Sequence, residues 1–235
     1  MSSASTPRRG TFIVVEGLDR SGKTTQVLKL VQELRSQRRY VKQIRFPDRT
    51  TMIGGMIDAY LQSKSDLEDH VIHLLFSANR WELADQIKSL ISQGCTIICD
   101  RYYYSGMIYS AAKLNPGLPL SWAREPDVGL PRPDLVIFLD LEPQEAEKRG
   151  GFGDEKYERK EMQRNVRRLF YELRDSDGEE KEDMVVVNAG RSIEEVGADV
   201  LRLVRVKLDS VHSQGSDSEL RTVGKWSSKG EVASG

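Results

Sequence analysis

The chain has 235 residues, which is enough for one large α/β domain or two small ones with a full hydrophobic core. Its 35 Lys and Arg residues nearly balance 36 Asp and Glu residues, so its net charge gives no reason to expect binding to nucleic acid or to a membrane. It contains no run of about 18 apolar residues, which excludes a membrane-spanning helix, and the polar residues 1–10 do not resemble a secretory signal.

The first predicted strand, residues 11–15, is followed by a glycine-rich segment, residues 17–24, with the sequence Gly-Leu-Asp-Arg-Ser-Gly-Lys-Thr. This segment fits the phosphate-binding P-loop, in which Lys23 reaches the β- and γ-phosphates and the Thr24 hydroxyl holds Mg²⁺. A helix face of Val27, Leu30, Val31 and Leu34 follows at the required place. The alternative is a chance glycine-rich turn, but the flanking strand and helix make it the weaker interpretation.

A second strand is predicted over residues 41–46. Pro47 ends it and directs Arg49 toward the carboxyl edge of the sheet, where ligands bind in α/β folds. A surface salt bridge is an equally good interpretation of Arg49 taken alone.

One long helix is predicted from about residue 67 to residue 91. Phe76 and Arg80 are four residues apart and share a face, so the ring could stack on a nucleobase while the guanidinium donates to the base edge. On spacing alone, a core Phe with an Arg extending to solvent is favoured. His70 and His73 lie on the same helix without a third metal ligand, and we interpret them as ordinary helix residues.

The third strand, residues 95–99, contains both cysteines of the chain, Cys95 and Cys99, and precedes Asp100-Arg101. The cysteines form no C-x-x-C pair, so reduced thiols in a core strand are expected, and with them a cytoplasmic protein that could also be nuclear. An acid at this position typically organises Mg²⁺ in P-loop enzymes, and Arg101 beside it could face a second phosphate.

Further strands are predicted over residues 135–139 and 184–187, and a last helix carries Ile193, Val196, Val200 and Val204. Strands that alternate with helices predict an α/β protein with a five-stranded parallel sheet covered on both faces, as in P-loop NTPases. Residues 1–10 are expected to be a flexible N-terminus, and 11–212 the P-loop domain.

Two segments resemble mobile surface loops: residues 149–161, which are charged and glycine-rich, and residues 175–183, which are acidic. Residues 213–235 are polar and rich in Ser and Gly, which predicts a flexible tail. Trp226 could anchor this tail on the domain, and an incidental Trp is an equally good interpretation.

Taken together, these segments resemble the thymidylate kinase family of P-loop nucleoside monophosphate kinases, over about residues 12–206. The arginine within the P-loop is typical of eukaryotic members. The resemblance is carried by the P-loop with Asp19-Arg20 and by residues 46–49, 73–82, 100–106, 126–131, 149–153 and 156–158.

The resemblance implies a role for each group of residues. For ATP and its phosphates, it implies Gly17, Leu18, Asp19, Arg20, Ser21, Gly22, Lys23, Thr24, Thr25 and Arg149. For dTMP, it implies Asp19, Phe46, Arg49, Phe76, Arg80, Arg101, Ser105, Gly106, Tyr109, Tyr157 and Gln163. For Mg²⁺, it implies Thr24 and Asp100, and for catalysis Lys23, Arg20, Arg101 and Asp19.

The implied activity is phosphorylation of dTMP to dTDP by ATP with Mg²⁺, in a homodimer with a lid at about residues 149–161. Two features depart from the family pattern. Lys156 stands where many members carry arginine, and the C-terminal tail is longer than the family core.

The chemistry is consistent with this activity, because the acceptor is a phosphate monoester whose second pKa is about 6, so that its dianion needs no general base. Three other functions can be considered. A nucleoside kinase or another monophosphate kinase shares the scaffold, but the former needs no acceptor-phosphate arginine such as Arg49. A GTPase needs an Asn-Lys-x-Asp motif, which the chain lacks, and a catalytically inactive scaffold is disfavoured by the intact Lys23, Thr24 and Asp100.

Overall fold

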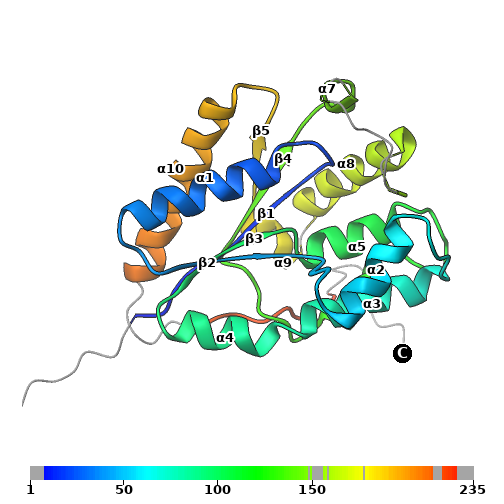
Figure 1. Ribbon diagram of the computed structural model, residues 1–235, viewed down its shortest axis with the longest axis horizontal. Helices are drawn as coiled ribbons and strands as arrows, with labels where there is room; N and C mark the ends of the chain where they lie inside the picture. The colour runs from blue at the N-terminus through cyan, green and yellow to red at the C-terminus, as the bar shows by residue number, and fades with distance from the viewer. Residues whose placement is uncertain are drawn as a thin grey trace, which may run out of the picture.

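The computed structural model describes residues 8–147, 149, 156–157, 159–176, 178–213 and 219–226. At its centre is a parallel five-stranded sheet with the strand order β2-β3-β1-β4-β5 (Figure 1). Its strands are β1 (Phe12–Gly17), β2 (Val41–Arg45), β3 (Thr96–Asp100), β4 (Leu135–Asp140) and β5 (Met184–Asn188). The predicted fold class is confirmed, and each predicted strand ends within two residues of the observed one.

Helices cover both faces of the sheet (Figure 1). They are α1 (Lys23–Ser36), α2 (Met52–Leu61), α3 (Asp69–Trp81), α4 (Ala84–Ser92), α5 (Tyr103–Ala111), α6 (Leu120–Arg124), the 3₁₀ turn η1 (Glu125–Asp127), α7 (Pro143–Glu147), α8 (Lys160–Asp175), α9 (Glu179–Asp183) and α10 (Ile193–Ser213). Within the described residues, no helix is long and apolar enough to cross a membrane.

The alternation of side chains along β1 divides the core into two layers. Ile13 and Val15 pack against α1 and α10, whereas Phe12 and Val14 pack on the opposite face, against α4, α5 and α8. All four side chains are fully buried, as expected for the central strand of a parallel sheet. The P-loop therefore leaves the sheet from a strand that is packed on both faces.

The strand order also determines where ligands can bind. The connection after β1 leads to β2 on one side of β1, and the connection after β3 leads to β4 on the other side. The neighbouring strands β1 and β3 therefore form a switch point, at whose carboxyl edge α/β proteins bind their ligands. The P-loop follows β1 at this edge, and Arg101 follows β3.

The single helix predicted over residues 67–91 is wrong, because the chain turns between Trp81 and Ala84. The two halves bury different faces. The helix α3 packs on α2 and α5, whereas α4 presents Ile87 and Ile91 to the sheet. A continuous helix could not direct its apolar stripe to both sets of neighbours.

The structure also differs from the predicted flexible segments. Gly10 is buried and donates its N–H to the Ile91 carbonyl at 2.7 Å, so residues 8–10 are part of the domain. Residues 179–183 form α9 rather than a solvated loop, and residues 219–226 pack on the domain rather than forming a free tail. Within the predicted lid, residues 150–155 and 158 lie outside the described part of the chain.

Candidate active site

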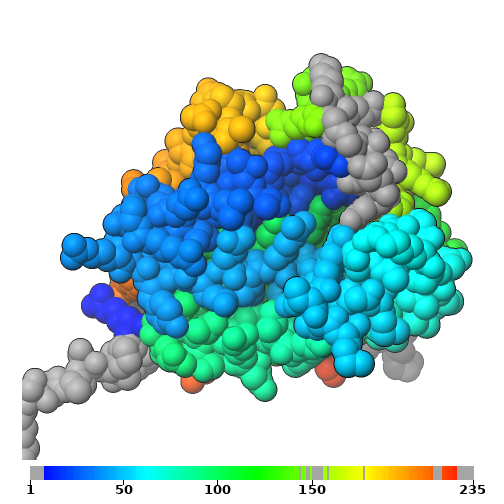
Figure 2. Space-filling model, in the orientation of Figure 1, coloured from blue at the N-terminus to red at the C-terminus, as the bar shows by residue number. Residues whose placement is uncertain are grey.

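A cavity of about 790 Å³ lies at the carboxyl edge of the sheet, beside the P-loop. In Figure 2 it opens between α1 and the side of the molecule formed by α2 and α3. Of the predicted site residues, those lining it are Asp19, Arg20, Ser21, Gly22, Lys23, Thr24, Thr25, Phe46, Arg49, Phe76, Arg80, Arg101, Ser105, Gly106, Tyr109, Arg149 and Tyr157. The other four, Gly17, Leu18, Asp100 and Gln163, lie directly behind this lining, as described below.

The P-loop conformation requires glycine at both ends. Gly17 has φ +152° and a Cβ there would lie 2.6 Å from the Leu139 carbonyl oxygen, while Gly22 has φ +91° at the start of α1. Arg20 adopts a left-handed φ of 65° without being glycine. Such a conformation costs on the order of 1–2 kcal/mol, so the surrounding loop must hold it in place.

At the start of α1, Lys23 and Thr24 face the end of β3. The Thr24 hydroxyl donates to Asp100 Oδ2 at 2.8 Å, and Lys23 Nζ donates to the Leu18 carbonyl at 2.6 Å. Burial and the nearby Arg101 lower the pKa of Lys23 to about 8. A bound polyphosphate would raise the pKa of this lysine again, because an adjacent negative charge raises the pKa of an amine.

Asp19 is at the centre of a hydrogen-bond network in the middle of the cavity. Its carboxylate pairs with Arg101 and accepts from Gln163 Nε2 at 2.7 Å and from the Tyr109 hydroxyl at 3.2 Å. Burial alone would raise the pKa of Asp19, but Arg101 and Lys23 hold that pKa below its usual value. The carboxylate is therefore ionised and fixed in direction.

Gln163 connects this network to Tyr157, which also lines the cavity. Its side-chain oxygen accepts from the Asp19 N–H at 3.1 Å, and its amide donates to the Tyr157 carbonyl at 2.9 Å. It comes from α8 and is 2 % exposed, which explains why it lies behind the lining.

Sequence reasoning missed Glu16, the last side chain of β1 before the P-loop. Its buried carboxylate accepts from the backbone N–H groups of Tyr102 at 2.8 Å and of Ser105 at 3.1 Å, and from the Ser105 hydroxyl. Burial raises the pKa of Glu16. It therefore supports the start of α5, which carries Ser105 and Gly106. The available signal was a lone acid that ends an otherwise apolar strand.

The far wall of the cavity is formed by α3, and η1 lies behind it. Phe76 is half-buried there, and Arg80 lies beside it, as predicted from the four-residue spacing. Arg80 is 2 % exposed and pairs with Asp127, Nε to Oδ1 at 3.0 Å and Nη2 to Oδ2 at 2.7 Å. A Cβ on Gly106 would lie 2.7 Å from the guanidinium, so a larger residue there would displace the guanidinium from this position. Asp127, which holds Arg80 in place through this ion pair, was not among the predicted residues.

Arg49 lines the cavity, as expected for a ligand-binding residue. It also forms a salt bridge, which was the alternative interpretation of this residue. Its Nη1 lies 2.7 Å from Asp58 Oδ1 on α2, and its side chain is 36 % exposed. Phe46, which directly follows β2, is buried against the ring of Tyr102. Both therefore belong to the wall that continues from β2 to α2.

The opposite end of the cavity is lined by the β5–α10 connection. Arg149 donates to the carbonyls of Arg20 at 3.1 Å and Ala189 at 2.8 Å and so joins this connection to the P-loop. Ser192 and Ile193 continue the lining. They carry no recognisable motif, and only their position after β5 could have indicated them.

The two histidines of α3 have structural partners, as predicted. His70 contacts Glu68 and the Gly117 carbonyl, and the buried His73 contacts the Ser110 hydroxyl at 2.7 Å. Burial and the charge of Arg80 lower the pKa of His73 to about 4, so its ring is neutral at physiological pH.

Comparisons with known proteins agree with this geometry. The family model described as thymidylate kinase matches residues 15–200. The chain is 49 % identical to the thymidylate kinase of Danio rerio over 82 % of its length and 89 % of the relative, and 48 % identical to that of Homo sapiens with the same coverage. The structure of thymidylate kinase from Candida albicans superimposes with a TM-score of 0.80 at 38 % identity, covering 92 % of this chain and 98 % of that one.

Proposed function

This chain belongs to the thymidylate kinase family, and we propose how its cavity holds the two substrates of that family's reaction. The protein transfers the terminal phosphoryl group of ATP to dTMP and forms dTDP and ADP. One observation carries the proposed arrangement. A single cavity extends from the P-loop to the wall that contains Arg49, Phe76 and Arg80, so that two nucleotides can meet inside it.

At the donor end, the backbone N–H groups from Gly17 to Thr25 would bind the phosphates of ATP, assisted by the positive end of α1. Lys23 and Arg20 would hold the phosphoryl group during transfer. Arg149 joins the P-loop to the β5–α10 connection, which supports an adenosine site against Ile193.

The residues that face the γ-phosphate fit a Mg²⁺ ion. Asp100 is 1 % exposed, and its Oδ1 has no hydrogen-bond partner among the described residues, while Oδ2 and the Thr24 hydroxyl meet at 2.8 Å. Asp100 and Thr24 thus offer neighbouring oxygens, and the buried Oδ1 without a partner suits a hard cation that also binds phosphate oxygens. When bound, Mg²⁺ would neutralise charge on the phosphates of ATP.

At the acceptor end, Arg49 and Arg101 would bind the phosphate of dTMP. The acceptor dianion and ATP repel one another, so these arginines must neutralise the acceptor and align it with the γ-phosphate. Ser105 and Tyr109 support this role, because Arg101 donates to both hydroxyls, at 3.0 and 3.4 Å.

The base and sugar of dTMP would occupy the wall beyond the arginines. Phe76 would stack on thymine, and Arg80, already oriented by Asp127, would donate to the base edge. Asp19 would accept from the sugar 3′-hydroxyl, and Gln163 would keep it in place. Phe46, Gly106 and Tyr157 would complete the wall.

Two single substitutions test this arrangement, because each removes one arginine at one end of the cavity. Arg49→Ala should weaken dTMP binding and leave ATP binding unchanged, and Arg149→Ala should do the reverse. A charged hydrogen bond contributes about 1.5–3 kcal/mol, so each affinity should fall by about 10- to 100-fold. Calorimetric titration of each variant with each nucleotide measures this. If both variants lose affinity for the same nucleotide, the two ends are wrongly assigned.

We also propose a homodimer formed through α2 and α3. The exposed side chains of these helices include Met52, which is 91 % exposed, and Met56, Val71 and Leu74. Val71 and Leu74 lie on one face of α3, and α2 packs beside it. Apolar side chains that gather on neighbouring helices typically mark an interface between proteins.

Finally, we propose that the protein acts in a reducing compartment, which is the cytoplasm or the nucleus. Support comes from Cys95 and Cys99, which are free buried thiols rather than partners in a disulfide.

A further inference from the structure

Residues 219–226, called here the C-terminal strap, run alongside residues 129–132 on the domain. Val223 is 1 % exposed, and the ring of Trp226 lies 5.9 Å from the guanidinium carbon of Arg124. The strap is therefore docked through one buried valine and one aromatic ring, even though its composition is polar.

The strap pairs with the backbone of residues 129–132. Gly129 N–H donates to the Val223 carbonyl at 2.8 Å, Val223 N–H donates to the Leu130 carbonyl at 2.9 Å, and Arg132 N–H donates to the Arg221 carbonyl at 2.8 Å. Pro131 and Thr222 form an antiparallel bridge between the same segments. The strap thus fixes residues 129–132 as an added strand would.

Residues 129–132 lie just after Asp127, the ion-pair partner of Arg80. The Leu130 N–H donates to the Asp127 carbonyl at 3.1 Å. The Asp127 carboxylate is fully buried and accepts hydrogen bonds from the Arg80 guanidinium and from the Ser77 hydroxyl. A shift of residues 129–132 would therefore move Asp127 and, with it, the guanidinium of Arg80.

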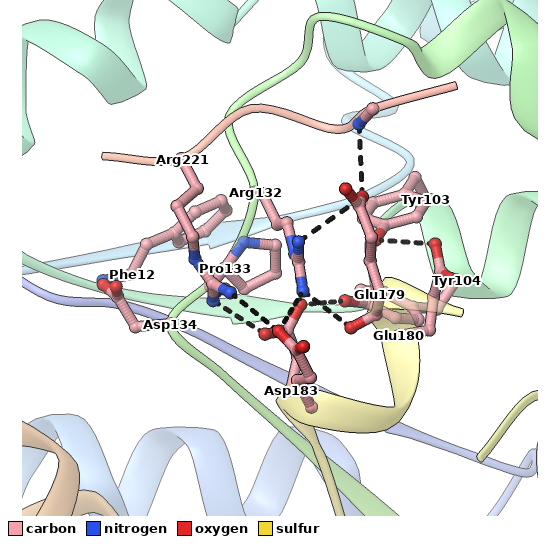
Figure 3. Close-up of polar contacts among 12 residues, drawn as sticks. Phe12, Tyr103, Tyr104, Arg132, Pro133, Asp134, Glu179, Glu180, Asp183 and Arg221 are labelled. Atoms are coloured by element: carbon pink, nitrogen blue, oxygen red, sulfur yellow. Dashed lines mark hydrogen bonds and ion pairs between the residues drawn. The ribbon is translucent and has the colours of Figure 1, made fainter. Parts of the chain in front are cut away.

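A buried ion cluster attaches the strap at a second point (Figure 3). Arg221 of the strap donates to Asp183 Oδ1 at 2.7 Å, and Arg132 donates to Asp183 Oδ2 at 2.6 Å. The hydroxyl of Tyr104 also donates to Asp183, at 3.2 Å, so the cluster reaches the first turn of α5, next to Gly106.

We propose that the C-terminal strap is a positioning element for recognition of the thymine base. By fixing residues 129–132 it fixes Asp127, and by fixing Asp127 it holds Arg80 against the base end of the cavity. The inference rests on the proposed function in one respect, namely that Arg80 contacts the base edge of dTMP.

The test uses substitutions in the full-length chain. Val223→Pro removes the N–H that donates to Leu130 and the buried side chain, and Val223→Ala removes only most of that side chain. Lys225→Ala is the matched control, because Lys225 is an exposed residue of the same strap. For each variant, kcat and the KM values for dTMP and ATP are measured well below its melting temperature.

We expect Val223→Pro to raise the KM for dTMP by about 3- to 30-fold, the range for substitutions that act through neighbouring residues, with the KM for ATP unchanged. Val223→Ala should raise the KM for dTMP by a smaller factor, and Lys225→Ala should leave the KM for dTMP unchanged. If Val223→Pro does not fold, Val223→Ala decides. If both KM values stay at the wild-type level while the melting temperature falls, the strap is only structural and the proposal is overturned.

A double-mutant cycle shows whether the strap acts through Arg80. Arg80→Lys keeps a charge beside Asp127 but cannot reproduce the planar fork. In the Arg80→Lys background, Val223 substitutions should cause no further rise in the KM for dTMP. An unchanged additional rise would overturn the proposed route. If Arg80→Lys itself leaves this KM unaltered while Val223→Pro raises it, the role of Arg80 in the proposed function is wrong, and with it this route.

Discussion

Arg20 and Arg101 both adopt left-handed backbone conformations, with φ of 65° and 66°, although neither is glycine. Both line the cavity at the position where ATP and dTMP would meet. Strain of this kind persists where the surrounding structure fixes a residue for a functional reason. For Arg20, we expect that reason to be stabilisation of charge on the phosphoryl group during transfer, as by an arginine finger.

Arg20→Ala should therefore lower kcat and kcat/KM together by about 10³- to 10⁵-fold, with little change in ATP affinity, because the lost contact forms mainly in the transition state. Arg20→Lys should restore little of the lost activity, since the point charge of an ammonium group cannot replace the planar, forked guanidinium group. Arg20→Gly is the control for backbone strain, because glycine adopts this φ freely, and it should be as inactive as Arg20→Ala. Steady-state kinetics measure all three variants. Retention of more than about a tenth of wild-type kcat in Arg20→Gly would mean that Arg20 only stiffens the loop.

Phe76→Ala should weaken dTMP binding by about 1–3 kcal/mol, the range for stacking of a base on an aromatic ring, and leave ATP binding unchanged. Phe76→Leu is the matched control, because it keeps apolar contact with the cluster around Ile57 and Ile72 but cannot stack. It should therefore lose dTMP affinity nearly as much, with a smaller loss of stability. Calorimetry that finds equal losses for ATP and dTMP would make Phe76 a core residue.

The positions of individual residues were predictable from the sequence where a motif or a fixed spacing exists. Lys23 lies in the P-loop as the motif requires, and the four-residue spacing of Phe76 and Arg80 placed both on one face of α3, which lines the cavity. Glu16 and Asp127 could not be predicted, because their importance comes from partners far along the chain. Glu16 binds the start of α5, and Asp127 binds α3. No local pattern encodes such contacts.

At the scale of elements, α9 shows why an acidic segment can be misinterpreted. Glu180 and Asp183 are almost fully buried, because they face Arg124 and Arg132, more than 50 residues earlier in the chain. The acidic composition of this segment predicts that it is exposed to solvent. Only the tertiary structure brings in the arginines that compensate the buried carboxylates. The break between α3 and α4 has a similar cause, since each half faces a different neighbour.

Asp183→Ala should lower the free energy of unfolding by about 3–5 kcal/mol, because it leaves Arg132 buried without this partner and also removes a partner of Arg221. Glu182→Ala is the matched control on the same helix, and it should change stability by less than about 0.5 kcal/mol because its side chain is 73 % exposed. Urea unfolding of both variants gives the comparison. Equal stabilities would show that the cluster contributes nothing.

At the scale of the whole molecule, the parallel sheet followed from strands separated by helices, and all five strands were predicted. The order β2-β3-β1-β4-β5 was not predicted, because it depends on the direction in which each connection crosses the sheet. That order brings the ends of β1 and β3 together and so creates the cavity.

The proposed dimer is a second whole-molecule feature that can be tested. Leu74→Glu should produce a monomer, because it places a charge in the apolar surface of α3. Val206→Glu is the control, since Val206 is an exposed valine on α10, away from this surface. Light scattering across a range of protein concentrations measures the mass of each form. A wild-type protein that is monomeric at every concentration would contradict the proposal.

The central claim is that one cavity brings ATP and a thymidine nucleotide together with the acceptor phosphate held by Arg49 and Arg101. The most direct measurement is ATP consumption by the purified protein with dTMP, dUMP, UMP, dCMP, AMP and thymidine as acceptors. We predict that dTMP has the highest kcat/KM and that thymidine is not phosphorylated, because it has no phosphate for the two arginines. Turnover of thymidine at a rate comparable to that of dTMP would contradict the account.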